Sequence, residues 1–268
     1  MTRIIVVTSG KGGVGKTTTT ANIGAALARA GKKVALLDAD FGLRNLDLLL
    51  GLENRVVYTA IDVINGDCRL DQALVKDRRN PNLSLMPAAQ SRDKTAVSVE
   101  QMGDLIEQLA PRCDYVLIDC PAGIEQGFQN AIVKASEAII VTTPDISAVR
   151  DADRVIGLLE AAQIYAAQLV VNRIRPEMIN ANNMMSVEDV VEILSIPLLG
   201  VVPEDSEVIV STNNGEPMVL SPQPTHAAVA FSNIGKRLEG EKVPFLDVAN
   251  LNDTLVTRFK RFLNTLNK

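Results

Sequence analysis

One glycine-rich stretch has the spacing of a loop that binds phosphate groups. Residues 10–17 read Gly-Lys-Gly-Gly-Val-Gly-Lys-Thr and match the pattern Gly-x4-Gly-Lys-[Ser/Thr] in full. Glycines let the backbone curl so that successive N–H groups point at phosphate oxygens, next to the positive end of a helix. We therefore expect Lys16 to reach the β- and γ-phosphates of a nucleotide and the Thr17 hydroxyl to bind Mg²⁺. A glycine-rich turn without a ligand is the alternative.

Carboxylates at the ends of two apolar runs could complete this site. Asp38 ends the run at 34–38 and Asp119 ends the run at 115–119. We expect both to act on the Mg²⁺ shell together with Thr17, with Asp119 acting mostly through water because Mg²⁺ retains several of its waters. An isolated aspartate at the end of a strand is better explained as a helix cap, so this prediction depends on the presence of the phosphate loop.

A second lysine in the loop, Lys11, is not required by the phosphate-binding pattern. With it, the stretch resembles the deviant Walker A (ParA/MinD) subgroup of P-loop ATPases, which share Lys-Gly-Gly-x-Gly-Lys-[Ser/Thr]. The resemblance implies an ATP-bound homodimer in which Lys11 contacts the partner's nucleotide and neutralises charge on the transferring phosphoryl group. Residues 38–47 resemble the first switch of the family, which makes Asp40 the candidate for orienting the attacking water. Lys11, Lys16 and Asp40 are thus the catalytic candidates, with an exposed surface lysine as the alternative for Lys11.

The resemblance also implies where the adenine base binds. In the family, an asparagine that ends one strand and the backbone of a segment that ends the next recognise the base, and here Asn172 and the segment 203–205 stand at those positions. An amide offers the donor and acceptor that the edge of adenine requires, although Asn172 could instead cap a loop. The expected nucleotide contacts are Gly10, Lys11, Gly12, Gly13, Val14, Gly15, Lys16, Thr17, Thr18, Asn172, Pro203 and Asp205.

These residues must be positioned by an α/β fold, because short β-branched runs alternate with helical patterns along most of the chain. Continuous apolar runs are typical of parallel strands covered on both faces. We expect a doubly wound, mostly parallel sheet flanked by helices, with ligands at the carboxyl ends of the strands. The expected strands are Ile4–Thr8, Val34–Asp38, Leu83–Pro87, Tyr115–Asp119, Ala138–Thr142, Leu169–Arg173 and Leu198–Val202. The expected helices include Thr17–Ala30, Val99–Leu109, Ile146–Ala162 and Val187–Leu194.

Composition excludes several other classes of protein. Of 268 residues, 47% are apolar and 22% are charged, which excludes a disordered chain. Three cysteines without metal-ligand spacing and a single histidine, His226, argue against a zinc site or a histidine-based triad. The N-terminus lacks a signal-peptide cleavage region, and no apolar run reaches the ~20 residues that a membrane span requires. We expect a cytoplasmic protein.

The last fifteen residues differ in character from the rest of the chain. A helix over 254–268 would gather Leu and Phe side chains within an arc of about 120°, with basic residues outside it. This is the pattern of a helix that lies on an anionic membrane. Four basic residues contribute at most ~4 kcal/mol, so one tail should bind marginally, whereas two tails could gain ~10²–10⁴ in avidity. A tail that docks on its own domain or in a partner groove is the alternative. The membrane-binding candidates are Leu255, Phe259, Phe262, Leu263, Leu266, Arg258, Lys260 and Arg261.

Taken together, the loop, the acidic stretches and the tail resemble the septum-site-determining branch of the ParA/MinD family. The resemblance implies an ATPase domain over 1–240, a linker over 241–253 and a membrane-targeting amphipathic helix over 254–268. It also implies ATP and Mg²⁺ as cofactors and a peripheral location on the cytoplasmic face of the inner membrane. The implied partners are a MinC-like division inhibitor and a MinE-like activator of hydrolysis. Asp151, Asp153 and Arg154 are the partner-binding candidates, unless they form an ordinary charged helix face.

Three rival interpretations remain at the level of sequence. A ParA-like partitioning ATPase would bind DNA through basic surface residues, but 27 basic against 32 acidic side chains make specific nucleic-acid binding the weaker option. An iron protein of the nitrogenase type would need cysteines placed to bridge a cluster at a dimer axis, and Cys68, Cys113 and Cys120 do not suggest this. A nucleotide-dependent scaffold with little turnover is the third alternative.

Overall fold

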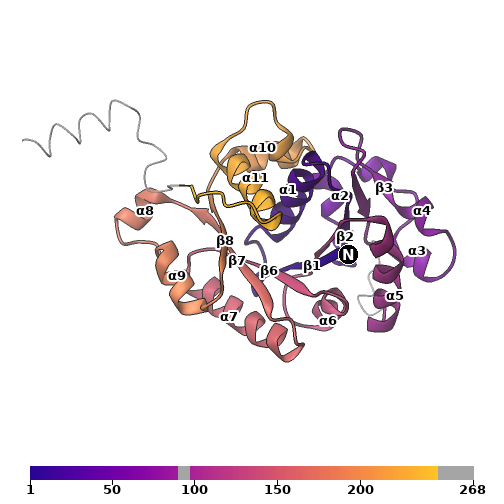
Figure 1. The fold of residues 1–268 in the computed structure, drawn as a ribbon, viewed down its shortest axis with the longest axis horizontal. Coiled ribbons are helices and arrows are strands. Elements are labelled where there is room, and N and C mark those ends of the chain that lie inside the picture. Colours follow the sequence, from indigo (N-terminus) through magenta and orange to yellow (C-terminus); the bar gives the residue numbers. More distant parts are fainter. Residues whose placement is uncertain (90–96, 247–268) are drawn as a thin grey trace, which may run out of the picture.

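One twisted sheet of eight strands forms the centre of the computed structural model, which describes residues 1–89 and 97–246 (Figure 1). The strands are β1 (Arg3–Thr8), β2 (Val34–Asp38), β3 (Val75–Lys76), β4 (Leu83–Met86), β5 (Tyr115–Asp119), β6 (Glu137–Thr142), β7 (Ala166–Ile174) and β8 (Leu198–Pro203). They lie in the order β3-β4-β2-β5-β1-β6-β7-β8, and every pair is parallel except β3 with β4. The predicted doubly wound, mostly parallel sheet is therefore confirmed.

Helices cover both faces of this sheet (Figure 1). The side chains of β1 alternate between the two layers, since Ile5 and Val7 pack in one core and Val6 packs in the other. One layer holds α1 and α11, and the opposite layer holds α5, α6, α7 and α9. The longer helices are α1 (Lys16–Arg29), α5 (Val99–Leu109), α6 (Gln126–Ile132), α7 (Ile146–Ala161), α9 (Val187–Leu194), α10 (Glu207–Asn213) and α11 (His226–Leu238). The shorter ones are α2 (Leu46–Leu49), α3 (Ala60–Ile64), α4 (Leu70–Ala73) and α8 (Pro176–Asn180), with 3-10 turns at Glu53–Arg55, Ala110–Arg112 and Met218–Leu220.

This topology determines where the site lies. The central strand β1 has β5 on one side and β6 on the other, and β5 in turn pairs with β2. The strand order reverses at β1, and in open α/β sheets ligands bind at such a reversal, outside the carboxyl ends of the strands. The carboxyl ends of β1, β2 and β5 carry the phosphate loop, Asp38 and Asp119 respectively.

The segment that follows α11 is held against the body. Arg237 donates hydrogen bonds to the carbonyls of Val243 (2.9 Å), Pro244 (2.7 Å) and Leu199 (3.0 Å), and its guanidinium lies over the ring of Phe245. Residues 241–246 therefore begin the predicted linker as an ordered strap. The rest of that linker and the predicted amphipathic helix over 254–268 lie outside the described residues. Among the helices of the described segments, none has the length and apolar character needed to cross a bilayer.

Candidate nucleotide-binding site

The phosphate loop connects the end of β1 to the first turn of α1. Gly13 and Gly15 have φ angles of +79° and +97°, which side chains other than glycine rarely adopt. Gly10 has a different constraint, because a Cβ atom there would lie 2.2 Å from the backbone oxygen of Asp151 in α7. The glycines at these positions are thus required both by the curl of the loop and by its close packing on α7.

Lys16 and two threonines of α1 face the buried carboxylate of Asp119. Lys16 is buried in the first turn of α1, and its charge lies close enough to Asp119 to lower the pKa of that carboxyl. The Thr20 hydroxyl donates a hydrogen bond to Asp119 Oδ1 at 3.1 Å, and Thr17 interacts with the same carboxylate through its hydroxyl. Thr20 was not among the candidates from sequence, although its position one turn after Thr17 on the same helix face would have indicated it.

Asp38 and Asp119 lie opposite one another on the neighbouring strands β2 and β5. Asp38 accepts backbone hydrogen bonds from Asp40 (3.0 Å) and Leu46 (3.3 Å), so it organises the whole turn that follows β2. Burial and the charge of Asp119 raise the pKa of Asp38 well above its usual range. Burial also raises the pKa of Asp119, against the opposing effect of Lys16. The pair is therefore short of positive charge.

The missing positive charge beside Asp38 and Asp119 could be supplied by a divalent cation. Oxygen donors from carboxylates and a hydroxyl suit Mg²⁺, and a cation beside two buried carboxylates would favour their ionised forms. Thr17, Asp38 and Asp119, the metal candidates, lie together at the ends of β2 and β5 and the start of α1. Within the described ranges, no group of three His, Cys, Asp or Glu side chains could by itself hold a metal ion. Phosphate oxygens and water would therefore have to complete the shell.

Lys11 points away from its own phosphate loop and contacts the start of α7. Its Nζ donates to Ser147 Oγ at 2.8 Å and lies 3.6 Å from Asp145 Oδ1. Asp145 also caps α7 by accepting from the Ala148 backbone N–H, and its hydrogen bonds lower its pKa to about 2 against the effect of burial. Because Lys11 and Asp145 are far apart in the sequence, no local pattern could have indicated this contact.

The predicted base site is a cavity of about 390 Å³ between the phosphate loop and the ends of β7 and β8. Asn172 is buried in its wall and donates from Nδ2 to the carbonyl of Val14 at 2.8 Å, which ties β7 to the loop. The cavity includes the predicted Gly15, Thr18, Pro203 and Asp205, together with Glu204 of the same segment. The lining residues that the sequence did not indicate are Arg173, Ser206, Val208, Ile209 and Phe231.

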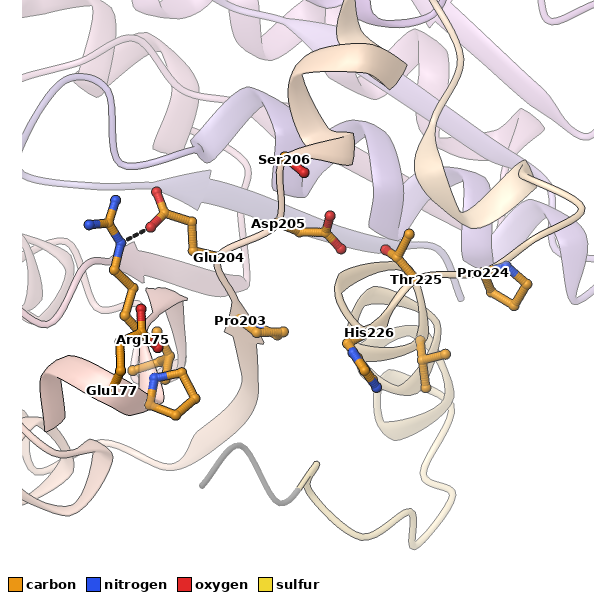
Figure 2. Close-up of a pocket in the computed structure, with 12 residues that line it drawn as sticks. Arg175, Glu177, Pro203, Glu204, Asp205, Ser206, Pro224, Thr225 and His226 are labelled. Carbon is orange, nitrogen blue, oxygen red and sulfur yellow. Dashed lines mark hydrogen bonds and ion pairs between the residues drawn. The ribbon is translucent and has the colours of Figure 1, made fainter. Parts of the chain in front are cut away.

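A second cavity, of about 710 Å³, lies on the other side of the segment 203–206. Figure 2 shows Arg175 and Glu204 paired on one wall and Thr225 and His226 on the other. No residue of the phosphate loop lines this cavity, so the smaller one is the candidate base site. The thiol of Cys120, next to Asp119, is buried, and burial raises its pKa to about 12, so it would be a poor nucleophile at neutral pH.

The partner-binding candidates lie on α7, the helix that also contacts Lys11. Asp153 and Arg154 are exposed, whereas Asp151 is half-buried because its backbone packs against Gly10. The eight membrane-binding candidates between Leu255 and Leu266 lie outside the described residues.

The parallel sheet, the phosphate loop and the paired aspartates define a P-loop nucleotide-binding protein. Residues 5–218 match the family described as "CobQ/CobB/MinD/ParA nucleotide binding domain". The chain is 63% identical over 263 residues to the septum site-determining protein MinD of Synechocystis sp., an alignment that covers 98% of this chain and 99% of the relative.

Two solved structures agree with this assignment. The structure of a MinC:MinD cell division protein complex from Aquifex aeolicus matches with a TM-score of 0.84 and 48% identity, over 90% of this chain and 98% of that one. MinD from Pyrococcus horikoshii, solved with Mg-ADP, matches with a TM-score of 0.81 and 33% identity, over 91% of this chain and 100% of that one. The chain belongs to the MinD family of septum site-determining proteins.

Proposed function

We propose that this chain hydrolyses ATP with Mg²⁺ at its phosphate loop and acts in placing the division septum. In this proposal, an ATP-bound homodimer binds the anionic cytoplasmic face of the inner membrane and recruits a MinC-like division inhibitor. A MinE-like activator of hydrolysis then releases the dimer from the membrane. The observation that carries the proposal is the cluster of Lys16, Thr17 and Asp119 at the phosphate loop, with Lys11 in the same loop facing outward.

The side chains of the site divide the chemistry of hydrolysis between them. Thr17, Asp38 and Asp119 would hold Mg²⁺, which would supply the positive charge that the two carboxylates and the phosphate oxygens of ATP require. Lys16 binds the β- and γ-phosphates, and Asp40, held by its backbone N–H on Asp38, orients the attacking water. The hydrogen bond from Thr20 holds Asp119 in place.

The surroundings of Lys11 support the dimer. Ile146, Ile124 and Leu43 are all exposed large apolar side chains, with exposed fractions of 78%, 48% and 61%. Ile146 begins α7, Ile124 lies between β5 and α6, and Leu43 lies between β2 and α2, so all three follow the carboxyl ends of strands at the nucleotide site. A partner copy would cover these side chains, and Lys11 would leave Ser147 to reach the partner's phosphates. The Aquifex relative forms a MinC:MinD complex, and the exposed Asp153 and Arg154 on α7 are where we place the inhibitor.

Co-sedimentation with anionic liposomes tests the membrane part of this proposal. We expect the full chain to sediment with ATP and to stay in solution with ADP, and we expect a chain that lacks residues 254–268 to stay in solution with both. Phe259→Glu should weaken binding sharply, because it places a charge on the apolar face of the tail. Equal binding with ADP and ATP would contradict the dimer switch, and ATP-dependent binding to duplex DNA would favour the partitioning alternative.

A further inference from the structure

Arg79, in the turn between β3 and β4, joins three separate segments through a single guanidinium. Nη1 donates to the carbonyl of Gly215 at 2.9 Å, and Nη2 donates to the carbonyl of Leu50 at 2.7 Å. The third partner is the fully buried carboxylate of Asp77, which lies 2.7 Å from Nη2. The Arg79 side chain itself is 31% exposed. Burial acts to raise the pKa of Asp77, but the hydrogen bonds and charge of Arg79 hold it below its usual range.

The two carbonyls belong to loops that touch each other. Gly51 and Gly215 have φ angles of +61° and +64°, and a Cβ atom on Gly215 would lie 2.5 Å from the Cα of Gly51. A Cβ atom on Gly51 would lie 2.8 Å from the carbonyl oxygen of Gly215, the oxygen that Arg79 binds. Since neither backbone has room to shift toward the other, a displacement of one loop must displace the other or break its bond to Arg79.

Each loop leads to a different part of the nucleotide site. The loop at Leu50 ends α2, and α2 begins at Leu46, whose backbone N–H is bound by Asp38. The loop at Gly215 follows α10, whose residues Val208 and Ile209 line the candidate base cavity. Arg79 thus links the segment that carries Asp40 to the helix that covers the base.

We infer that Arg79 is a positioning residue that transmits occupancy of the base cavity, through α10 and Gly215, to the switch segment 38–47. The inference deepens the proposed function and depends on adenine occupying this cavity. The planar guanidinium presents two donors in a fixed fork, so the distance between the Gly215 and Leu50 carbonyls is held constant. A lysine keeps the charge opposite Asp77, but its single ammonium cannot reproduce that fork.

A single tryptophan can report this coupling, because the chain has none of its own. Leu48 lies on α2 and is 50% exposed, so Leu48→Trp places a fluorophore on the switch side without filling the core. ADP and pyrophosphate both fill the phosphate loop, but only ADP fills the base cavity. The difference between their effects on the Leu48→Trp spectrum therefore isolates the contribution of the base.

We expect this ADP-specific change in fluorescence to fall about fivefold or more when Arg79→Lys is added. Arg112→Lys is the matched control, because Arg112 pairs with Asp71 on the surface and should leave the change intact. Asp77→Asn removes the ion pair but keeps both carbonyl bonds, so it should also retain the change, and it covers the case in which Arg79→Lys fails to fold.

The inference is overturned if the change persists in Arg79→Lys, if it is lost in Asp77→Asn at unaltered melting temperature, or if ADP and pyrophosphate act alike in the Leu48→Trp chain. A purely structural role for Arg79 would lower the melting temperature and leave the ADP-specific change in the folded fraction. The fluorescence readout involves no hydrolysis, membrane or partner. A chain that did not hydrolyse ATP would therefore contradict the proposed function, while the role of Arg79 would still be decided by the ADP-specific change in fluorescence.

Discussion

Asp40 is placed to act on water because the turn that carries it is built around another carboxylate. Its backbone N–H donates to Asp38 Oδ1 at 3.0 Å, and its charge is felt by both Asp38 and Asp119. We predict that Asp40→Asn lowers single-turnover ATP hydrolysis by about 10²–10⁴-fold, the range for a lost general base or water-orienting group. ATP affinity should change much less, because Lys16 and the loop backbone hold the phosphates.

The control for this prediction is Asp67→Asn, an exposed aspartate in the turn after α3, which should hydrolyse ATP normally. Lys16→Ala, in contrast, should lose nucleotide binding and hydrolysis together, since it removes the charge that faces the phosphates. If Asp40→Asn turned over ATP at the rate of the unsubstituted chain, Asp40 would not position the water.

The raised pKa of Asp38 predicts how the free energy of unfolding depends on pH when EDTA keeps divalent cations out of the site. Between about pH 4, the ordinary range for an aspartate, and the raised value in the folded chain, the folded state binds more protons than the unfolded state. The free energy of unfolding must therefore fall as pH rises through that interval. We predict that Asp38→Asn flattens this slope, with Asp119 responsible for the part that remains.

The slope is the readout here, because asparagine also changes the hydrogen bonds to Asp40 and Leu46 and so shifts the stability at every pH. Urea unfolding at several pH values measures it. Saturating Mg-ADP should flatten the slope of the unsubstituted chain, since the cation supplies the charge that the two carboxylates lack. An equal slope in Asp38→Asn and the unsubstituted chain would contradict the assignment.

At the scale of elements, the phosphate loop and α7 behave as one packed unit. Gly10 lies so close to the backbone of Asp151 that a methyl group cannot fit without moving the loop or the helix. We predict that Gly10→Ala lowers the free energy of unfolding by about 1–3 kcal/mol, as overpacking typically does, and weakens nucleotide binding as well. Thermal melts and ADP titration measure the two effects.

The matched change on the same helix is Gly157→Ala. Its Cβ atom would meet nothing within 4 Å, and an alanine in the middle of α7 should raise stability by about 0.5–1 kcal/mol. If Gly10→Ala changed neither the free energy of unfolding nor ADP binding, the loop and α7 could move apart without cost. The packing of the loop on α7 would then not fix the contact of Lys11 with Ser147.

The elements that could be predicted are those whose local pattern is strong. The strands at 34–38 and 115–119 were expected with the bounds they have, because buried parallel strands are continuous apolar runs. The two-residue strand β3 and the four-residue helix α2 were not expected, since neither is long enough to show a period. The Lys11–Ser147 contact and the Arg79 bridge depend on chain segments that only the folded topology brings together.

On the scale of the whole molecule, the formal net charge of −5 averages two unlike parts. Residues 254–268 hold four basic and no acidic side chains, while the other residues hold 23 basic and 32 acidic ones, a net charge of −9. An anionic surface should therefore repel the body and attract the tail. Arg237 holds the segment 241–246 against β8, so this part of the predicted linker belongs to the acidic body.

This division allows the number of tails engaged at the membrane to be counted. Each basic side chain near an anionic surface contributes about 1 kcal/mol, so Lys260→Gln should weaken the binding of one tail about fivefold. If ATP joins two chains whose tails bind together, the same substitution acts twice and should cost about 30-fold. Liposome titrations with ATP and with ADP at low salt measure both factors. A larger factor with ATP than with ADP, shrinking in both cases as salt is added, would show two tails acting through charge. Equal factors in the two nucleotide states would mean that each tail binds alone, and dimerisation would then not be the switch.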